Sequence, residues 1–165
     1  HIIEDEEPAH VTLQHQLPND PSIYIHNLSF TYTGAGNEPV LQDISLHLPA
    51  YKTTAIVGMS GSGKSTLLKL LLRFFESYEG DIKIGSTAFK NISPRYWRSQ
   101  CGAVMQDSFI FNDTIIKNIT VTEDPIDMER VIEACKVANI LEYIEGLPLG
   151  FYTKLGAEGI GMSGG

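Results

Sequence analysis

The segment Gly58–Ser65, which reads GMSGSGKS, constrains the fold of this chain more than any other feature. It fits G-x-x-x-x-G-K-[ST], the pattern of a phosphate-binding P-loop. Glycine permits the tight backbone curl that turns successive N–H groups toward one anion. Lys64 adds a positive charge for the outer phosphates, and the hydroxyl of Ser65 is a suitable ligand for Mg²⁺. The pattern therefore predicts a phosphate site between a strand and a helix.

The residues on both sides of the loop favour this interpretation. Residues 54–57 (TAIV) form a short β-prone run, as expected of a buried parallel strand. Residues 66–75 are apolar on most faces, and Ser65, Lys69 and Arg73 form a polar stripe at i, i+4 spacing. This pattern indicates a helix packed into a core, whose N-terminus also favours an anion. A glycine- and serine-rich surface loop is the alternative, and the order of strand, loop and helix argues against it.

The composition limits the classes of function. The chain has 165 residues, 42% of them hydrophobic, and a formal net charge of −8. This length is enough for one domain with a core, and no apolar stretch is long enough for a membrane span. Because the balance of charge is acidic, we expect no nucleic-acid partner. Cys101 and Cys135 fit neither a disulfide nor a metal spacing, so we expect free thiols and no metal cluster.

The remaining patterns predict a linker followed by a mixed α/β domain. Residues 1–22 are acidic and contain proline, which is typical of a linker. Alternating apolar residues favour antiparallel strands with one wet face, with a bulge near His26 and Asn27. Strands are expected over 23–32, 40–48 and 101–105, with a short strand pair over 80–85. Helices are expected over 94–99 and about 127–144.

Four further segments carry motif-like residues in a fixed order. They are 30–32 (FTY), 104–119 (which begins VMQD), 147–159 (LPLGFYTKLGAEG) and 162–165 (MSGG). With the P-loop, they resemble the A-loop, the Q-loop, the X-loop stretch and the start of the L-S-G-G-Q signature of an ABC transporter nucleotide-binding domain, exporter type. Met162 stands where this family usually has leucine. Lys154 and Ala157 stand where many exporters have acidic residues, which departs from the usual X-loop contacts.

The resemblance implies how ATP and Mg²⁺ would be held. Tyr32 would stack on adenine. The phosphate-binding set would be Gly58, Ser60, Gly61, Ser62, Gly63, Lys64, Ser65 and Thr66. Ser65 and Gln106 would ligate Mg²⁺, and Gln106 would also sense the γ-phosphate. Lys64 and Gln106 are the candidate catalytic residues.

The resemblance also implies partners. Ser163 and Gly164 would contact the γ-phosphate on the opposite subunit, since two such domains sandwich two ATP molecules in this family. The other partner would be the transmembrane domain of the same transporter, with residues 1–22 as the tail of that preceding domain. The domain would lie at the cytoplasmic face of the cell membrane. The implied function is an ATP-binding domain that couples ATP binding and hydrolysis to transport across the membrane.

The expected fold class is α/β: part of a P-loop NTPase core, with an antiparallel β-subdomain and a helical subdomain. Residues 23–165 would form the N-terminal part of the ATP-binding domain, ending inside the signature. Since the family's Walker B aspartate and catalytic glutamate would lie beyond Gly165, we expect this chain to bind nucleotide and to be inactive as an ATPase. The alternatives are a nucleotide-gated module that does not hydrolyse ATP, or another P-loop NTPase, although no N-K-x-D guanine motif is present.

Overall fold

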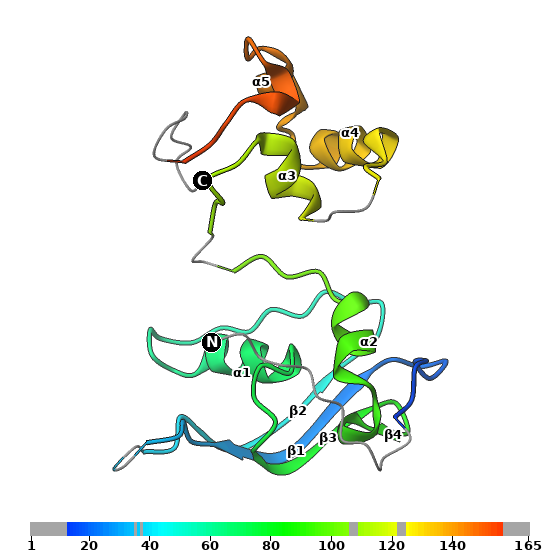
Figure 1. Cartoon of the computed structure of the whole chain (residues 1–165). Coiled ribbons are helices and arrows are strands. Elements are labelled where there is room, and N and C mark those ends of the chain that lie inside the picture. The colour runs from blue at the N-terminus through cyan, green and yellow to red at the C-terminus, as the bar shows by residue number, and fades with distance from the viewer. Residues whose placement is uncertain (1–12, 35, 37, 106–108, 122–124, 157–165) are drawn as a thin grey trace. The chain divides into compact units, whose positions relative to one another are not determined.

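The structure is a computed structural model that describes residues 13–34, 36, 38–105, 109–121 and 125–156. The chain forms two compact units, residues 1–103 and 104–165, which are described one at a time. The first unit contains β1 (Ile23–Phe30), β2 (Leu41–Leu48), α1 (Lys64–Leu71), β3 (Glu79–Ile84), β4 (Thr87–Ala88), η1 (Phe89–Asn91) and α2 (Pro94–Ser99) (Figure 1). The second contains α3 (Ile115–Thr120), α4 (Met128–Val137), α5 (Leu141–Glu145) and η2 (Gly150–Tyr152).

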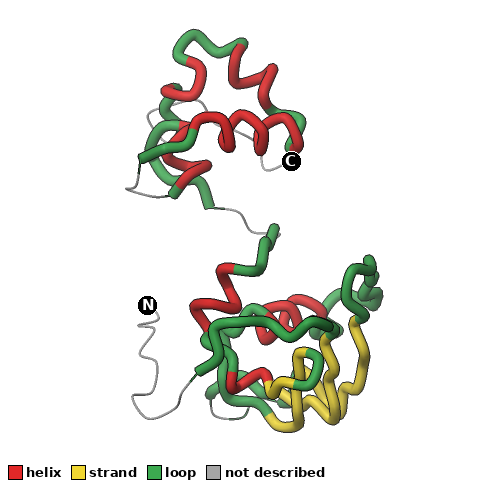
Figure 2. Tube along the Cα trace, turned by 90° about the vertical axis from the view of Figure 1, so that its right-hand side faces the viewer, coloured by secondary structure: helices red, strands yellow, loops and turns green. Residues whose placement is uncertain are grey.

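The first unit is built on a four-stranded antiparallel sheet with the order β2-β1-β3-β4. Its strands are the yellow segments of Figure 2. The predicted bulge in β1 is present, because the register with β2 shifts between Ile25 and Leu28. Asn27 adopts a left-handed backbone with φ 51° at this point. A Cβ on Gly80 of β3 would lie 2.4 Å from the carbonyl oxygen of Asn27, so the bulge requires glycine at position 80.

One face of this sheet is covered by α1 and α2 (Figure 1). Leu67 and Leu70 of α1 and Trp97 of α2 pack in one core with the inward side chains of the strands. The predicted helix over 94–99 is confirmed. Pro94 occupies its first turn, and the Ser93 side chain accepts a hydrogen bond from the backbone N–H of Tyr96.

Two sequence predictions in this region are wrong. Residues 54–57 and 101–105 were expected to be buried strands, and neither forms a strand. Several of their apolar side chains are exposed instead, 88% for Val57 and 102% for Val104, although Cys101 packs partly buried against the core. A buried parallel strand needs a hydrogen-bonding neighbour and cover on both faces, and no described strand pairs with either segment. The parallel sheet expected for the P-loop core is therefore absent from the described residues.

The helix after the P-loop is confirmed, but it begins two residues earlier and ends earlier than predicted. It ends at Leu71 because the chain turns at Arg73, whose φ is 57°. Arg73, one of the three residues of the polar stripe, lies beyond the end of the helix and is only 7% exposed. Its guanidinium is turned inward among backbone carbonyls, a contact that i, i+4 spacing does not reveal.

The second unit is helical. The helix predicted over 127–144 is broken into α4 and α5, with Asn139 at φ 56° between them. Asp127 caps α4, because its carboxylate accepts hydrogen bonds from the N–H groups of Glu129 and Arg130. Ile115, Val131, Cys135, Ile144 and Leu155 form the buried core of this unit.

Residues 13–22, which the sequence places in a linker, make backbone contacts with the first unit. The N–H of Gln14 donates to the carbonyl of Asn91 (2.8 Å), and the N–H of Ser93 donates to the carbonyl of Gln14 (2.9 Å). The N–H of Gly85 donates to the carbonyl of Ser22 (2.7 Å). No helix in the described part of the chain is long and apolar enough to span a membrane.

Candidate functional site

The P-loop forms an exposed turn that leads directly into α1. Gly61 and Gly63 have φ values of 79° and 85°, which side-chain-bearing residues rarely adopt. The N–H of Ser62 donates to the carbonyl of Met59 (3.2 Å), closing a tight turn. The N–H of Leu67 donates to the carbonyl of Gly63 (2.9 Å), which starts the helix. The local geometry therefore combines a curled loop and a helix N-terminus.

The ammonium group of Lys64 lies across this loop. Its Nζ donates to the carbonyl of Gly58 (2.8 Å), the carbonyl of Met59 (2.6 Å) and the hydroxyl of Ser62 (3.2 Å). The side chain thus folds back toward the start of its own loop. This arrangement places a positive charge beside the loop backbone, where it can attract an anionic group.

Gly63 is required for packing as well as for backbone conformation. A Cβ at this position would lie 2.6 Å from Cδ2 of Leu41 and 3.0 Å from the carbonyl oxygen of Val40. The end of the loop is therefore pressed against the start of β2. Sequence reasoning missed this contact because nothing in the pattern links residue 63 to residues 40 and 41.

Tyr32, which follows β1, is joined to the first turn of α1. Its hydroxyl lies 3.0 Å from Oγ1 of Thr66, within hydrogen-bond distance. Its ring lies edge-on to Phe30 (5.0 Å between centroids, 81°) and to Phe75 (5.3 Å, 85°). The structure therefore brings the predicted base-binding residue and one predicted phosphate-binding residue into direct contact. Phe75 is a further member of this cluster that the sequence did not identify.

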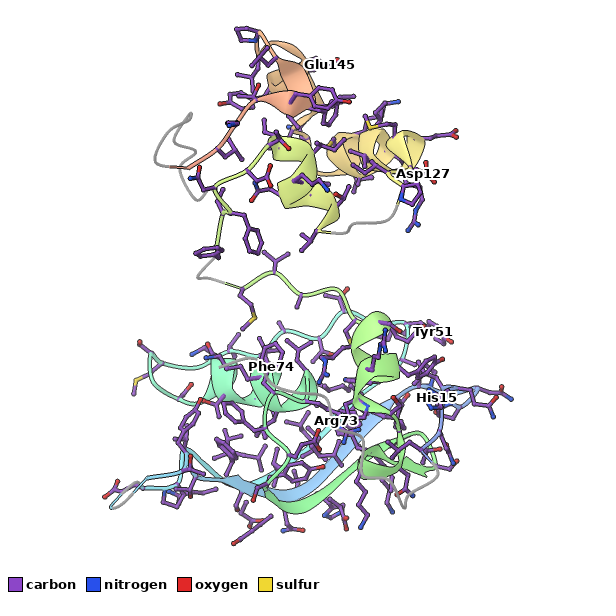
Figure 3. The ribbon with its side chains drawn as sticks, viewed as in Figure 1. His15, Tyr51, Arg73, Phe74, Asp127 and Glu145 are labelled. Carbon is purple, nitrogen blue, oxygen red and sulfur yellow. The ribbon has the colours of Figure 1, made fainter. Side chains whose placement is uncertain are left out.

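Arg73 anchors the segment that carries Phe75 (Figure 3). Its Nη1 donates to the buried carbonyls of Phe89 (3.2 Å) and Ile92. Its Nε and Nη2 bind the two carboxylate oxygens of Glu76 at 3.0 and 2.7 Å. The end of α1 is thereby tied to η1 and to the residues that precede α2.

Only some of the predicted phosphate and metal ligands lie within the described part of the chain. Ser60 and Ser65 are exposed, and the Ser65 hydroxyl lies on the first turn of α1, where it offers the oxygen ligand that Mg²⁺ prefers. Gln106, Ser163 and Gly164 lie outside the described residues. Among the described residues, no group of three or more His, Cys, Asp or Glu side chains could hold a metal ion.

Burial alters the pKa of three side chains away from the P-loop. It raises the pKa of the Cys101 and Cys135 thiols and of the Tyr78 phenol, and for Tyr78 the charge of Arg73 partly opposes this effect. Both cysteines are free thiols, as predicted. Raised thiol pKa values disfavour the thiolate, so neither cysteine has the character of an activated nucleophile.

The fold and loop geometry define an α/β domain of the P-loop NTPase class, and comparison with known proteins identifies the family. Residues 41–165 match the family model described as ABC transporter, which covers more than half of the chain. The chain belongs to the ABC transporter family. The resemblance to the nucleotide-binding domain of its exporter-type members, inferred from the motifs, is confirmed.

Similar proteins are found in an animal and in bacteria. Heavy metal tolerance factor 1 of Caenorhabditis elegans is 45% identical over 157 residues, 93% of this chain and 19% of that protein. The ATP-dependent lipid A-core flippase of Desulfotalea psychrophila is 42% identical over 148 residues, 90% of this chain and 25% of that protein. The chain therefore spans about a fifth to a quarter of the length of these relatives.

A solved structure shares the fold. It is described as a bacterial Atm1-family ABC exporter with ATP bound, and it superposes with a TM-score of 0.83 at 35% identity. The match covers 95% of this chain and 27% of the exporter chain. This likeness confirms the predicted α/β fold class, including the antiparallel subdomain before the P-loop helix.

Proposed function

We propose that this chain is the ATP-binding part of an ABC exporter, in which ATP binding and hydrolysis drive transport across a membrane. One observation carries the proposal: the curled loop 58–63, closed by Lys64 and continued by α1, in a chain that belongs to the ABC transporter family. The relatives' names support it, since they include an ATP-dependent flippase and an exporter solved with ATP bound.

The P-loop residues would hold the phosphates of ATP. Backbone N–H groups between Gly58 and Thr66 would face the phosphate oxygens, and Lys64 would exchange its loop carbonyl partners for the outer phosphates. Ser65 would supply an oxygen ligand to Mg²⁺, together with Gln106. A bound Mg²⁺ would neutralise charge on the β- and γ-phosphates.

The remaining site residues have proposed roles at the two ends of the nucleotide. Tyr32 would stack on adenine. Gln106 would sense the γ-phosphate and relay its presence to the membrane domain. Ser163 and Gly164 would contact the γ-phosphate bound by a second nucleotide-binding domain. The proposed partners are therefore the transmembrane domain of the same transporter and a second copy of the ATP-binding domain, at the cytoplasmic face of the membrane.

The test of ATP binding is the Lys64→Ala variant, measured by calorimetry with ATP and AMP in the presence of Mg²⁺. Lys64 would contact only the outer phosphates, so the substitution should weaken ATP more than AMP. Lys69→Ala removes the same charge from the last turn of α1 and serves as the matched control. Equal losses for ATP and AMP, or an equal effect of the two lysine substitutions, would contradict the assignment.

The role of Gln106 is tested in the intact transporter. Gln106→Ala should reduce transport more than it reduces ATP affinity, because its proposed role is to transmit nucleotide state. If the variant loses ATP binding while transport for each bound ATP stays intact, the residue is a binding residue and not a coupling residue.

A further inference from the structure

We propose that Thr66 and Phe75 are positioning residues for the nucleotide base, because together they hold the ring of Tyr32. The hydrogen bond between Tyr32 and Thr66 then couples binding of the base to binding of the phosphates at the loop. This inference rests on the proposed function above and deepens it. It concerns purine nucleoside triphosphates, which reach both the base platform and the loop, and it assigns a role to the tyrosine hydroxyl that stacking alone does not need.

The first observation is the tether between the two elements. The Tyr32 hydroxyl lies 3.0 Å from Oγ1 of Thr66. Thr66 is 7% exposed and comes directly after Lys64 and Ser65 in the first turn of α1. Threonine in a helix occupies mainly two χ1 rotamers, so the hydroxyl of the buried Thr66 has few positions in which to meet Tyr32. The hydrogen bond therefore fixes the ring edge of Tyr32 relative to the P-loop.

The second observation is the aromatic support of the same ring. Phe30 and Phe75 both meet Tyr32 edge-on, with interplanar angles of 81° and 85°. Phe30 belongs to the core and is 5% exposed, so it provides a rigid side to this cluster. Edge-to-face pairs contribute beyond area burial and define the orientation of both rings. The contacts that hold Tyr32 therefore include these two rings and the hydrogen bond to Thr66.

The third observation explains how Phe75 reaches Tyr32. The chain reverses at Arg73, whose buried guanidinium binds the carboxylate of Glu76 and the carbonyls of Phe89 and Ile92. The N–H of Phe74 donates to the carbonyl of Lys69 (3.0 Å). Phe74 is 41% exposed, whereas the next residue, Phe75, turns toward the core. The two adjacent phenylalanines therefore differ in their surroundings, which offers an internal control.

The consequence is a selective effect on ligands that contain a base. Without the hydroxyl the ring of Tyr32 can still stack, but it is no longer held in register with the phosphate loop. ATP engages both places at once and should lose affinity, whereas inorganic tripolyphosphate engages only the loop. The affinity ratio of ATP to tripolyphosphate therefore reports the coupling.

The experiment measures this ratio by calorimetry in Mg²⁺ on the full 165-residue chain. Tyr32→Phe should bind ATP about two- to tenfold more weakly, the range expected for one neutral hydrogen bond, with tripolyphosphate unchanged. Thr66→Val should lower the ratio of ATP to tripolyphosphate affinity similarly, and Thr66→Ser, which keeps the hydroxyl, should retain most of it. The double variant Tyr32→Phe, Thr66→Val should not lower the ratio further than Tyr32→Phe alone, because both substitutions remove the same hydrogen bond. Phe75→Leu should lower the ratio, while Phe74→Leu should not.

Fluorescence of Trp97, the single tryptophan, confirms that each variant retains its core. Two results would overturn the inference alone: wild-type ATP affinity in Tyr32→Phe, or equal losses of ATP and tripolyphosphate. If the wild-type chain binds neither ligand, the proposed function itself fails and this inference fails with it. These outcomes are distinct, because the first two require a wild-type chain that binds ATP.

Discussion

Replacing Arg73 by methionine should destabilise the first unit more than any change to its ion-pair partner. Arg73 is 7% exposed, and its guanidinium donates to two buried carbonyls, those of Phe89 and Ile92. It also lies 5.2 Å from the centroid of the Phe89 ring. Glu76, in contrast, has a side chain that is 58% exposed. The buried carbonyl contacts should therefore outweigh the ion pair.

The magnitudes follow from these environments. A hydrogen bond from a charged donor contributes about 1.5–3 kcal/mol, so two of them indicate about 3–6 kcal/mol for Arg73→Met, to which the buried cation–π contact adds. Glu76 is the exposed member of the ion pair, and Glu76→Gln keeps a side-chain oxygen that can accept from the guanidinium, so Glu76→Gln should cost less than Arg73→Met. With a urea m-value of about 1–3 kcal/mol/M, even the lower end of the range for Arg73→Met, about 3 kcal/mol, should lower the unfolding midpoint by roughly 1–3 M.

Urea unfolding followed by Trp97 fluorescence is the appropriate assay. The indole Nε1 of Trp97 donates to the carbonyl of Leu71 (2.6 Å), near the turn at Arg73, and its ring meets Phe89 edge-on. Arg73→Lys keeps the charge but lacks the planar donor fork, so it should fall between wild type and Arg73→Met. The reasoning is refuted if Glu76→Gln costs as much as Arg73→Met, or if Arg73→Met costs less than about 1 kcal/mol.

Three further predictions concern the site and the second unit. Tyr32→Ala should weaken ATP binding by about 1–3 kcal/mol, the range for base stacking, whereas Tyr32→Trp should be tolerated. An unchanged ATP affinity of Tyr32→Ala, measured by calorimetry, would reject stacking. Gly63→Ala should destabilise the first unit more than Gly61→Ala. Both positions have positive φ, which costs an alanine about 1–2 kcal/mol of strain, but only a Cβ at position 63 would meet Leu41, at 2.6 Å. Equal urea midpoints for the two variants would contradict this. Cys135 should react slowly with a disulfide reagent at pH 8, because burial raises the pKa of its thiol above the ordinary 9.0. The protonated thiol stabilises the fold below pH 9, and that contribution is lost as the pH rises through the folded-state pKa. Labelling of the native chain as fast as labelling in denaturant would disprove the burial of Cys135.

Local patterns predicted much of this fold correctly. Three features were predictable from residues close together in the sequence. They are the bulge in β1, the strands β1 and β2, and the helix α2 with proline in its first turn. The P-loop was predictable for the same reason, since its glycines and Lys64 are contiguous. The break at Asn139 within the predicted helix was missed, because apolar periodicity continues from α4 into α5.

The failures involve long-range contacts. Residues 54–57 look like a buried strand, but whether such a run forms one depends on neighbouring strands that the run itself does not encode. The buried state of Arg73 depends on carbonyls 16 and 19 residues away. The contact of Tyr32 with Thr66 spans 34 residues. Sequence patterns therefore identified the candidate site residues, while the structure was needed to show which of them touch.

The exposed apolar residues before and at the start of the P-loop have a consequence for handling this polypeptide. Ile56 and Val57, before the loop, are 38% and 88% exposed, Met59 within it is 84% exposed, and the adjoining backbone belongs to no described strand. Such a segment can serve as a template on which a second chain adds β-structure. Its self-association would be second order in protein, so it would grow steeply at the high concentrations used in calorimetry. A dilution series followed by light scattering would measure this self-association, and nucleotide bound at the adjacent loop should slow it if these residues form the contact.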